Sequence, residues 1–140
     1  MKQIVMLCTA LLIMVSSISC NAQGTNKEVG QNGISSNVTV YYFHFTRRCS
    51  TCMAVEENAK KAVEALYPDK VKSGEYSFTA INLDDASSKE VAKKLSVGGQ
   101  TLLVVRGDKK IDITSAAWLS AHDPDKMKVE IKSGIEKVLF

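Results

Sequence analysis

The feature that most constrains the fold is a strand-like run followed at once by a helical pattern, with two cysteines at the junction. Residues 38–45 read Val-Thr-Val-Tyr-Tyr-Phe-His-Phe, which is β-branched and aromatic almost throughout and predicts a central strand. Apolar residues then recur at three- and four-residue steps from Cys52 to Leu66, which predicts an amphipathic helix. Cys49 and Cys52 therefore lie where the chain leaves the strand and the helix begins.

The rest of the chain predicts three further strands and further helices. A strand over residues 76–83 is followed by a short helix, which begins at the Ser-x-x-Glu capping box of residues 87–90. Two strands over residues 101–106 and 109–114 are joined at Gly107-Asp108. One or two helical turns over residues 116–121 and a last helix capped by Asp123 complete the chain. A crossover helix makes the first two strands parallel, whereas the hairpin adds an antiparallel edge to the same sheet. We therefore expect an α/β fold, a three-layer sandwich with a mixed four-stranded sheet in the order β-α-β-α-β-β-α.

The first twenty residues have a different character from the rest. Lys2 precedes an apolar run over residues 4–15, and small residues then lead to Cys20, which predicts a secretory signal peptide over residues 1–19. The run is too short to cross a bilayer as a helix. Residues 20–36 contain few large apolar side chains and three glycines, which predicts a flexible tether before one domain over residues 37–140.

The end of the predicted signal peptide decides where the protein resides. Residues 17–20, Ser-Ile-Ser-Cys, resemble a relaxed bacterial lipobox, in which Cys20 becomes the lipidated first residue of a lipoprotein. We therefore expect export and a lipid anchor in the bacterial cell envelope facing the periplasm. The alternative is cleavage after Ala22, which would leave a soluble periplasmic protein.

Processing also reduces the number of cysteines that can pair. Cys8 lies in the apolar core of the signal and Cys20 is acylated or removed, so only Cys49 and Cys52 remain for an oxidising compartment. The net charge of +3 comes from dispersed lysines and acids rather than a basic block, and no aromatic residues interleave with arginine. We therefore expect no nucleic-acid partner and no membrane contact beyond the lipid anchor.

The Cys-x-x-Cys spacing at a helix start has a chemical consequence. Free N–H groups and the positive end of the helix dipole favour a thiolate there, and Arg47 and Arg48 add positive charge that would lower the pKa of Cys49. Cys49 is the expected nucleophile, which attacks a partner disulfide, and Cys52 is the expected resolving thiol, which releases the mixed disulfide. This chemistry needs no cofactor or metal other than the redox-active disulfide itself.

The order and spacing of these elements resemble the thioredoxin superfamily over residues 38–139. The resemblance includes the Cys-x-x-Cys, the second strand at residues 80–84 (Ala-Ile-Asn-Leu-Asp) and the segment at residues 98–105 (Gly-Gly-Gln-Thr-Leu-Leu-Val-Val). More narrowly, the chain looks like a small exported bacterial family catalogued as a nitrophenyl compound nitroreductase subunit, which implies an accessory redox role. No flavin-binding sequence is present, so we do not expect nitroreductase activity.

The sequence also departs from the thioredoxin pattern at several positions. The resemblance implies that Gln100 and Thr101 contact the substrate, but Gln100 stands where the family has a cis-proline. A non-proline cis bond costs about 3 kcal/mol, so we expect Gln100 to be trans. Arg48 replaces a tryptophan and Phe43 a buried acid. His44 is then the nearest titratable group, which would accept a proton only if it faced Cys52, whereas a purely structural role is the more common one.

These observations favour an exported thiol–disulfide oxidoreductase specialised for a particular partner. The expected partners are protein thiols and disulfides, together with a membrane electron donor or acceptor, and we expect a monomer. One alternative is a binding module that keeps the fold without the activity, and a permanent disulfide is another. A third is a soft-metal protein, because thiolates near Met53 suit Cu(I), although a helix after residue 87 argues against known carriers of that kind. Zinc would need two further ligands, and His44 and His122 lack the spacing.

Overall fold

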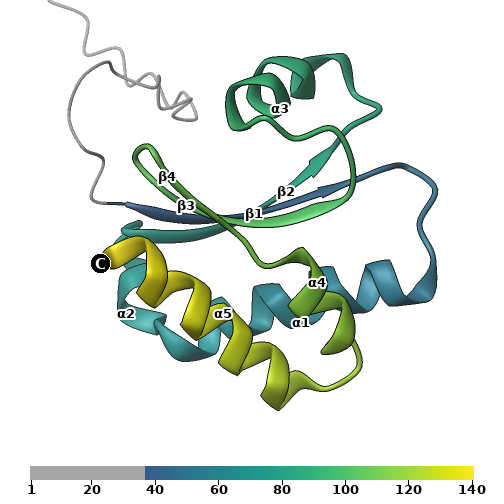
Figure 1. Ribbon diagram of the computed structural model, residues 1–140. Helices are drawn as coiled ribbons and strands as arrows, with labels where there is room; N and C mark the ends of the chain where they lie inside the picture. The colour runs from purple at the N-terminus through teal and green to yellow at the C-terminus, as the bar shows by residue number, and fades with distance from the viewer. Residues whose placement is uncertain (1–36) are drawn as a thin grey trace, which may run out of the picture. The chain divides into compact units, whose positions relative to one another are not determined.

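The computed structural model describes residues 37–140. The predicted signal peptide, the lipidation site Cys20 and the predicted tether lie outside the described residues. The elements are, in chain order, β1 (Val38–His44), α1 (Ser50–Leu66), α2 (Pro68–Lys72), β2 (Tyr76–Asn82), the 3-10 helix η1 (Ala86–Ser88), α3 (Lys89–Leu95), β3 (Thr101–Arg106), β4 (Lys109–Asp112), α4 (Thr114–Leu119) and α5 (Pro124–Leu139) (Figure 1). In this part of the chain no helix is both long and apolar enough to cross a bilayer.

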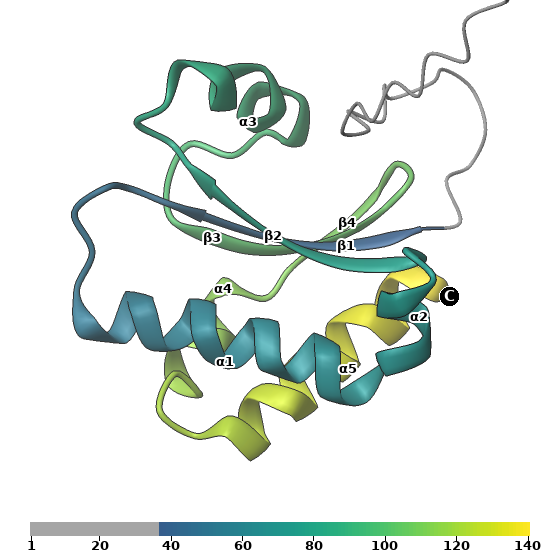
Figure 2. The same cartoon turned by 180° about the vertical axis from the view of Figure 1, so that it is seen from behind.

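The four strands form one mixed sheet in the order β2-β1-β3-β4. β1 is parallel to β2, with Val38 opposite Tyr76, and antiparallel to β3, in which Thr101 lies opposite Phe43. β4 continues the sheet antiparallel to β3. The parallel pair and the antiparallel hairpin edge are both as predicted. Helices α1, α4 and α5 lie on one side of the sheet and α3 on the other (Figures 1 and 2), an arrangement compatible with the predicted sandwich.

The main hydrophobic core lies between the sheet and the pair α1 and α5. Alternate strand residues, including Val40 and Leu102, contribute to it because every second side chain points to the same face. The last helix, α5, contributes an apolar stripe that is fully buried, at Met127, Ile131, Ile135 and Val138. α5 packs so closely on the sheet at Gly134 that a Cβ there would lie 3.0 Å from the Val104 side chain, which favours glycine at this position. The intervening strand residues point to the other face of the sheet, where Phe43, Leu103 and Val105 are buried on the α3 side.

Pro68 follows the end of α1 and occupies the first turn of the short helix α2. The start of α3 differs from the expectation. The capping box at residues 87–90 does not form. Ser87 lies within η1, and Ser88 is the N-cap of α3, but its hydroxyl donates to the Asp85 carbonyl instead of accepting from the helix. Serine hydroxyls often compete in this way with regular capping.

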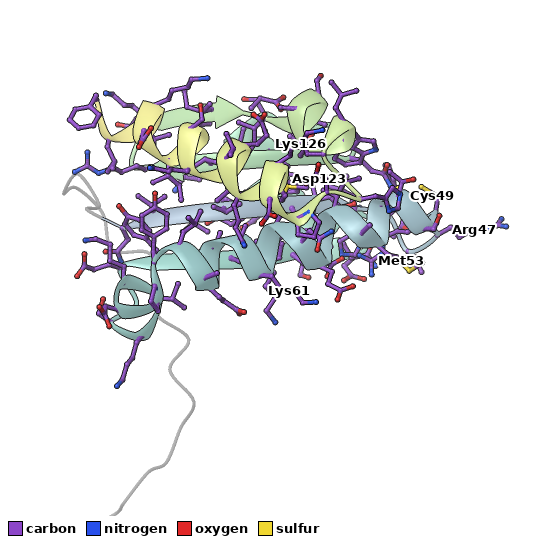
Figure 3. The ribbon with its side chains drawn as sticks, turned by 90° about the horizontal axis from the view of Figure 1, so that it is seen from below. Arg47, Cys49, Met53, Lys61, Asp123 and Lys126 are labelled. Atoms are coloured by element: carbon purple, nitrogen blue, oxygen red, sulfur yellow. The ribbon has the colours of Figure 1, made fainter. Side chains whose placement is uncertain are left out.

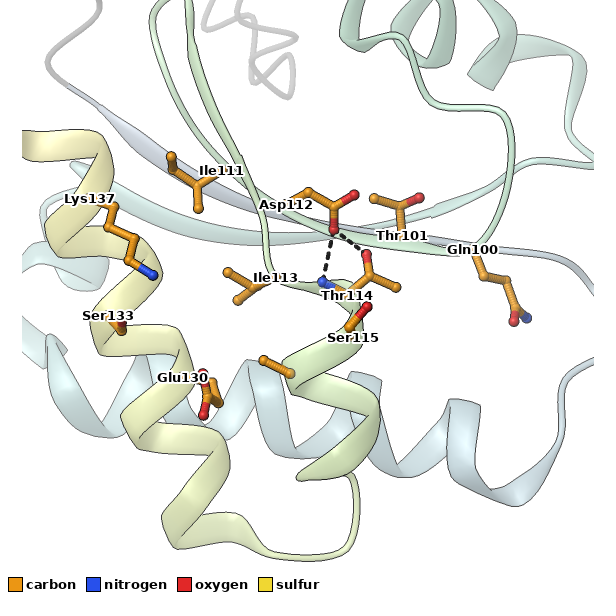
Figure 4. Close-up of a pocket in the computed structure, with 11 residues that line it drawn as sticks. Gln100, Thr101, Ile111, Asp112, Ile113, Thr114, Ser115, Glu130, Ser133 and Lys137 are labelled. Atoms are coloured by element: carbon orange, nitrogen blue, oxygen red, sulfur yellow. Dashed lines mark hydrogen bonds between the residues drawn. The ribbon is translucent and has the colours of Figure 1, made fainter.

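The fourth strand ends earlier than predicted because a side-chain relay turns the chain into α4. The Asp112 carboxylate accepts from the Thr114 N–H at 2.8 Å and also from the Thr114 hydroxyl. Figure 4 shows both hydrogen bonds between Asp112 and Thr114. The same hydroxyl accepts from the Leu102 N–H at 3.0 Å, which joins the turn to β3. β4 therefore ends at Asp112, and α4 begins two residues later.

Candidate redox site

The two cysteines occupy different positions at the start of α1. Cys49 is the N-cap residue, with an extended backbone, and its sulfur accepts from the Cys52 N–H at 3.4 Å. It is exposed at the end of the helix (Figure 3), whereas Cys52 is only 4% exposed. Both thiols are free, and their sulfurs lie 2.8 Å apart at hydrogen-bonding distance. The sequence therefore predicted both the position of the pair at a helix start and its proximity.

Hydrogen bonding lowers the pKa of Cys49 below its ordinary value. The largest cause is the hydrogen bond from the Cys52 thiol, followed by the backbone N–H of Cys52, and a smaller contribution comes from Thr51. Donors that point at the sulfur stabilise its anion, as expected at a helix N-terminus. Cys49 is also exposed, so its thiolate is the more accessible of the two sulfurs.

The loop between β1 and the cysteines is attached to the end of β2. The Thr46 N–H donates to the Asp84 carboxylate at 2.8 Å, and the Asn82 amide donates to the Thr46 hydroxyl at 2.9 Å. The hydrogen bond from the Thr46 backbone is the main cause that holds the pKa of Asp84 below its ordinary value. These contacts fix the path of the chain from the sheet to Cys49.

The two arginines before the motif are arranged differently from each other. Arg48 forms an ion pair with Glu56, which lies eight residues later in α1, and both side chains are largely shielded. Arg47 is exposed and extends away from the ribbon (Figure 3). The causes that lower the Cys49 pKa are hydrogen bonds rather than either guanidinium. The predicted tuning of Cys49 by Arg47 and Arg48 stays a prediction.

Tyr42 of β1 contacts Cys52, and no sequence pattern predicted this contact. Its side chain is fully buried, and its hydroxyl donates to the Cys52 carbonyl at 2.9 Å. Burial raises the pKa of Tyr42 to about 12, with a further rise from a charge on Cys52, so the phenol remains a donor. The ring also lies 6.0 Å from that of Trp118 in α4. Tyr42 thus connects the central strand to the first turn of α1.

Gln100 also reaches the motif, through its side chain. The amide oxygen lies 3.6 Å from the Cys52 sulfur, in a geometry that allows the thiol to donate to it. All peptide bonds of residues 37–140 are trans, including those at Gln100, which agrees with the expectation. The Thr101 hydroxyl donates instead to the Gly99 carbonyl at 3.0 Å. Of the two residues predicted to contact substrate, Gln100 is therefore the one that contacts a cysteine.

An open cavity of about 500 Å³ extends from Gln100 along the edge strand β4. It lies between the turn into α4 and one face of α5 (Figure 4). Polar side chains form most of its lining, among them Thr101, Thr114, Ser115, Glu130, Ser133 and Lys137. Gln100 is therefore shared between this cavity and the cysteine pair.

The two histidines lie at different distances from the motif. His44 is mostly buried, its Nδ1 lies 3.0 Å from the Phe45 carbonyl, and its ring stacks on Tyr42. Within residues 37–140 no hydrogen bond joins His44 to a cysteine, so its predicted proton-acceptor role gains no support. His122 instead lies beside the motif, with Nε2 3.5 Å from the Thr51 hydroxyl. No sequence signal indicated this contact, since the two residues are 71 positions apart.

The described residues contain no group of three or more histidine, cysteine or acidic side chains placed to hold a metal ion. The cysteine pair and Met53, which is 52% exposed, are the soft ligand atoms near the helix start. No known family model matches the sequence, and no curated protein is significantly similar to it.

Proposed function

We propose that this chain is an exported, thioredoxin-like thiol–disulfide oxidoreductase that exchanges disulfides with protein thiols. The observation that carries the proposal is the asymmetric cysteine pair. Cys49 is exposed with a lowered pKa, and its sulfur lies 2.8 Å from that of the buried Cys52. An exposed nucleophile with a resolving thiol in contact is the arrangement that two-step exchange requires.

The proposed reaction transfers two electrons from the dithiol to a partner disulfide. The Cys49 thiolate attacks one partner sulfur, so a mixed disulfide forms and the other partner sulfur leaves as a thiolate. Cys52 then loses its proton and attacks the Cys49 sulfur, which closes the Cys49–Cys52 disulfide and releases the second partner thiolate. The two protons of the dithiol end on the two partner thiols. The reverse sequence oxidises a partner dithiol.

The topology supports the thioredoxin-like part of the proposal. A parallel β1-α1-β2 unit and an antiparallel β3-β4 hairpin followed by α5 share one sheet, and the motif begins the helix after the central strand. Gln100 in trans, in the place of the family's cis-proline, supports a specialised partner rather than general protein disulfides. Export and the lipid anchor at Cys20 belong to the proposal on the grounds of the sequence alone.

Trapping of the mixed disulfide tests the proposal. The variant Cys52→Ser retains the nucleophile but cannot resolve the intermediate, so we expect a partner to remain bound to it through a disulfide. The variant Cys49→Ser is the matched control, because it leaves the buried thiol in place and should trap nothing. Analysis by non-reducing gels and mass spectrometry then identifies both the bond and the partner.

Two results would contradict the proposed oxidoreductase activity. One is the absence of any trapped partner with Cys52→Ser in the cell envelope. The other is a purified, reduced protein that fails to reduce insulin and forms no internal disulfide in glutathione buffers. Together these results would favour a binding module that has kept the fold without the exchange chemistry.

A further inference from the structure

The side chain of Gln100 provides a hydrogen-bond acceptor whose thiol donor exists in only one redox state of the site. Its amide oxygen lies 3.6 Å from the Cys52 sulfur, which is 4% exposed. Only a protonated Cys52 can donate to that oxygen, and its single proton is available there in the neutral dithiol, where the Cys49 thiol can be the donor between the two sulfurs. A disulfide sulfur has no hydrogen, so the contact becomes an acceptor facing an acceptor once the pair is oxidised.

The position of Gln100 follows from the sheet rather than from crowding in its loop. Thr101 begins β3 opposite Phe43 of β1. Gln100, one residue earlier, therefore lies beside the end of β1, and the chain continues from that end to the cysteines. Gly98 and Gly99 precede it, and a Cβ on either would meet no atom within 4 Å. The register of β3 therefore brings the amide to Cys52.

We propose that Gln100 sets the redox poise of the cysteine pair by stabilising the dithiol form. The inference rests on the proposed function, since it requires the pair to cycle. When glutathione disulfide oxidises the pair, the two S–H bonds and the glutathione S–S bond are broken. A Cys49–Cys52 bond forms, and two glutathione thiols receive the protons and electrons. The hydrogen bond from Cys52 to Gln100 is lost when the disulfide forms, so oxidation of the dithiol is less favourable than it would be without Gln100. The disulfide form of the protein is therefore a stronger oxidant.

The size of the effect is modest, because a thiol is a weak donor and water can reach the half-buried amide after oxidation. Loss of one such hydrogen bond corresponds to a change of about three- to fivefold in the equilibrium constant. For a two-electron couple this is about 14 to 21 mV. We therefore expect Gln100→Met, which keeps the length of the side chain without the amide, to favour the disulfide by that factor.

The experiment equilibrates purified protein in glutathione buffers, quenches with acid and measures the oxidised fraction by mass. Gln100→Met should show the three- to fivefold increase in the constant for disulfide formation. Gln100→Glu keeps an oxygen acceptor and should favour the dithiol at least as strongly as the wild-type chain. Ser115→Ala is the matched control, since Ser115 lines the same cavity but makes no described contact with a cysteine.

A second measurement tests the contact without any redox cycling. In Cys49→Ser the single remaining thiol of the domain is Cys52, and its infrared S–H stretching band should move to higher frequency when Gln100→Met is added. An unmoved band, or equal equilibrium constants for the wild-type chain and Gln100→Met, would overturn the inference while leaving the proposed function intact. A wild-type chain that forms no disulfide in these buffers would overturn both.

Discussion

Replacement of Tyr42 by phenylalanine isolates the bond that attaches the central strand to the reactive helix. The ring is fully buried and phenylalanine has the same shape, so its contact with Trp118 is retained and no cavity forms. What is lost is the hydrogen bond of 2.9 Å from the phenol to the Cys52 carbonyl. That carbonyl lies in the first turn of α1 and keeps its partner in the helix, so it is not left unsatisfied.

The expected cost is therefore the net value of one buried hydrogen bond, about 1 kcal/mol in the free energy of unfolding. With a urea dependence of about 2 kcal/mol per molar, the unfolding midpoint should fall by about 0.5 M. The measurement uses urea titration under reducing conditions, so that only the dithiol form is present. We expect the slope of the transition to stay unchanged, since the surface exposed on unfolding is the same.

Tyr41→Phe is the matched control for this measurement. Tyr41 is the neighbouring residue on the same strand, on the opposite face of the sheet, and its ring lies 5.9 Å from that of Phe43. Among the described residues its hydroxyl has no hydrogen-bond partner, so its removal should leave the midpoint within experimental error. The reasoning would be refuted if Tyr42→Phe left the midpoint unchanged, or if Tyr41→Phe lowered it equally.

Two further predictions concern the reactivity of Cys49. The variant Cys52→Ala removes the largest cause of the lowered Cys49 pKa, so the pKa should rise towards its ordinary value and iodoacetamide should react more slowly at neutral pH. Cys52→Ser retains a donor and should preserve the faster rate; equal rates for the two variants would contradict the assignment. Glu56→Gln removes the carboxylate that pairs with Arg48, so the positive charge near Cys49 is no longer offset. If Arg48 tunes the thiolate, alkylation should accelerate at low ionic strength and slow again with added salt, whereas an unchanged rate would show that it does not.

Most of the secondary structure could be predicted because each element carries its own local pattern. The β-branched and aromatic run of β1, the apolar periodicity of α1 and the cap at Asp123 all follow from side chains a few residues apart. The Asp123 carboxylate accepts from the Lys126 N–H, as a cap does. The errors arose where two local patterns compete. Residues 87–90 have the sequence of a capping box, but Ser88 is the N-cap and its hydroxyl donates to Asp85. β4 ends early because Asp112 accepts hydrogen bonds from the turn that follows it.

The site could be predicted only as far as its local part. The spacing of Cys49 and Cys52 and their place at a helix start follow from neighbouring residues. The contact of Cys52 with Gln100 joins residues 48 positions apart, and that of Thr51 with His122 joins residues 71 positions apart. Such contacts depend on strand register and on how the loops after α3 and α4 pack, which no short pattern encodes.

The contacts around Cys52 also bear on which cysteine takes which part in the proposed exchange. Its N–H donates to Cys49, its carbonyl accepts from Tyr42, and its thiol faces Gln100, so three separate segments hold it in place. The Cys49 sulfur has hydrogen bonds within the motif alone, and the residue is exposed. A partner sulfur can therefore approach Cys49, whereas an attack by Cys52 on an external disulfide would require α1 to separate from β1. Within the motif, by contrast, Cys52 is already in contact with the sulfur it must attack. The fold thus favours one order of steps, in which Cys49 forms the intermediate and Cys52 resolves it.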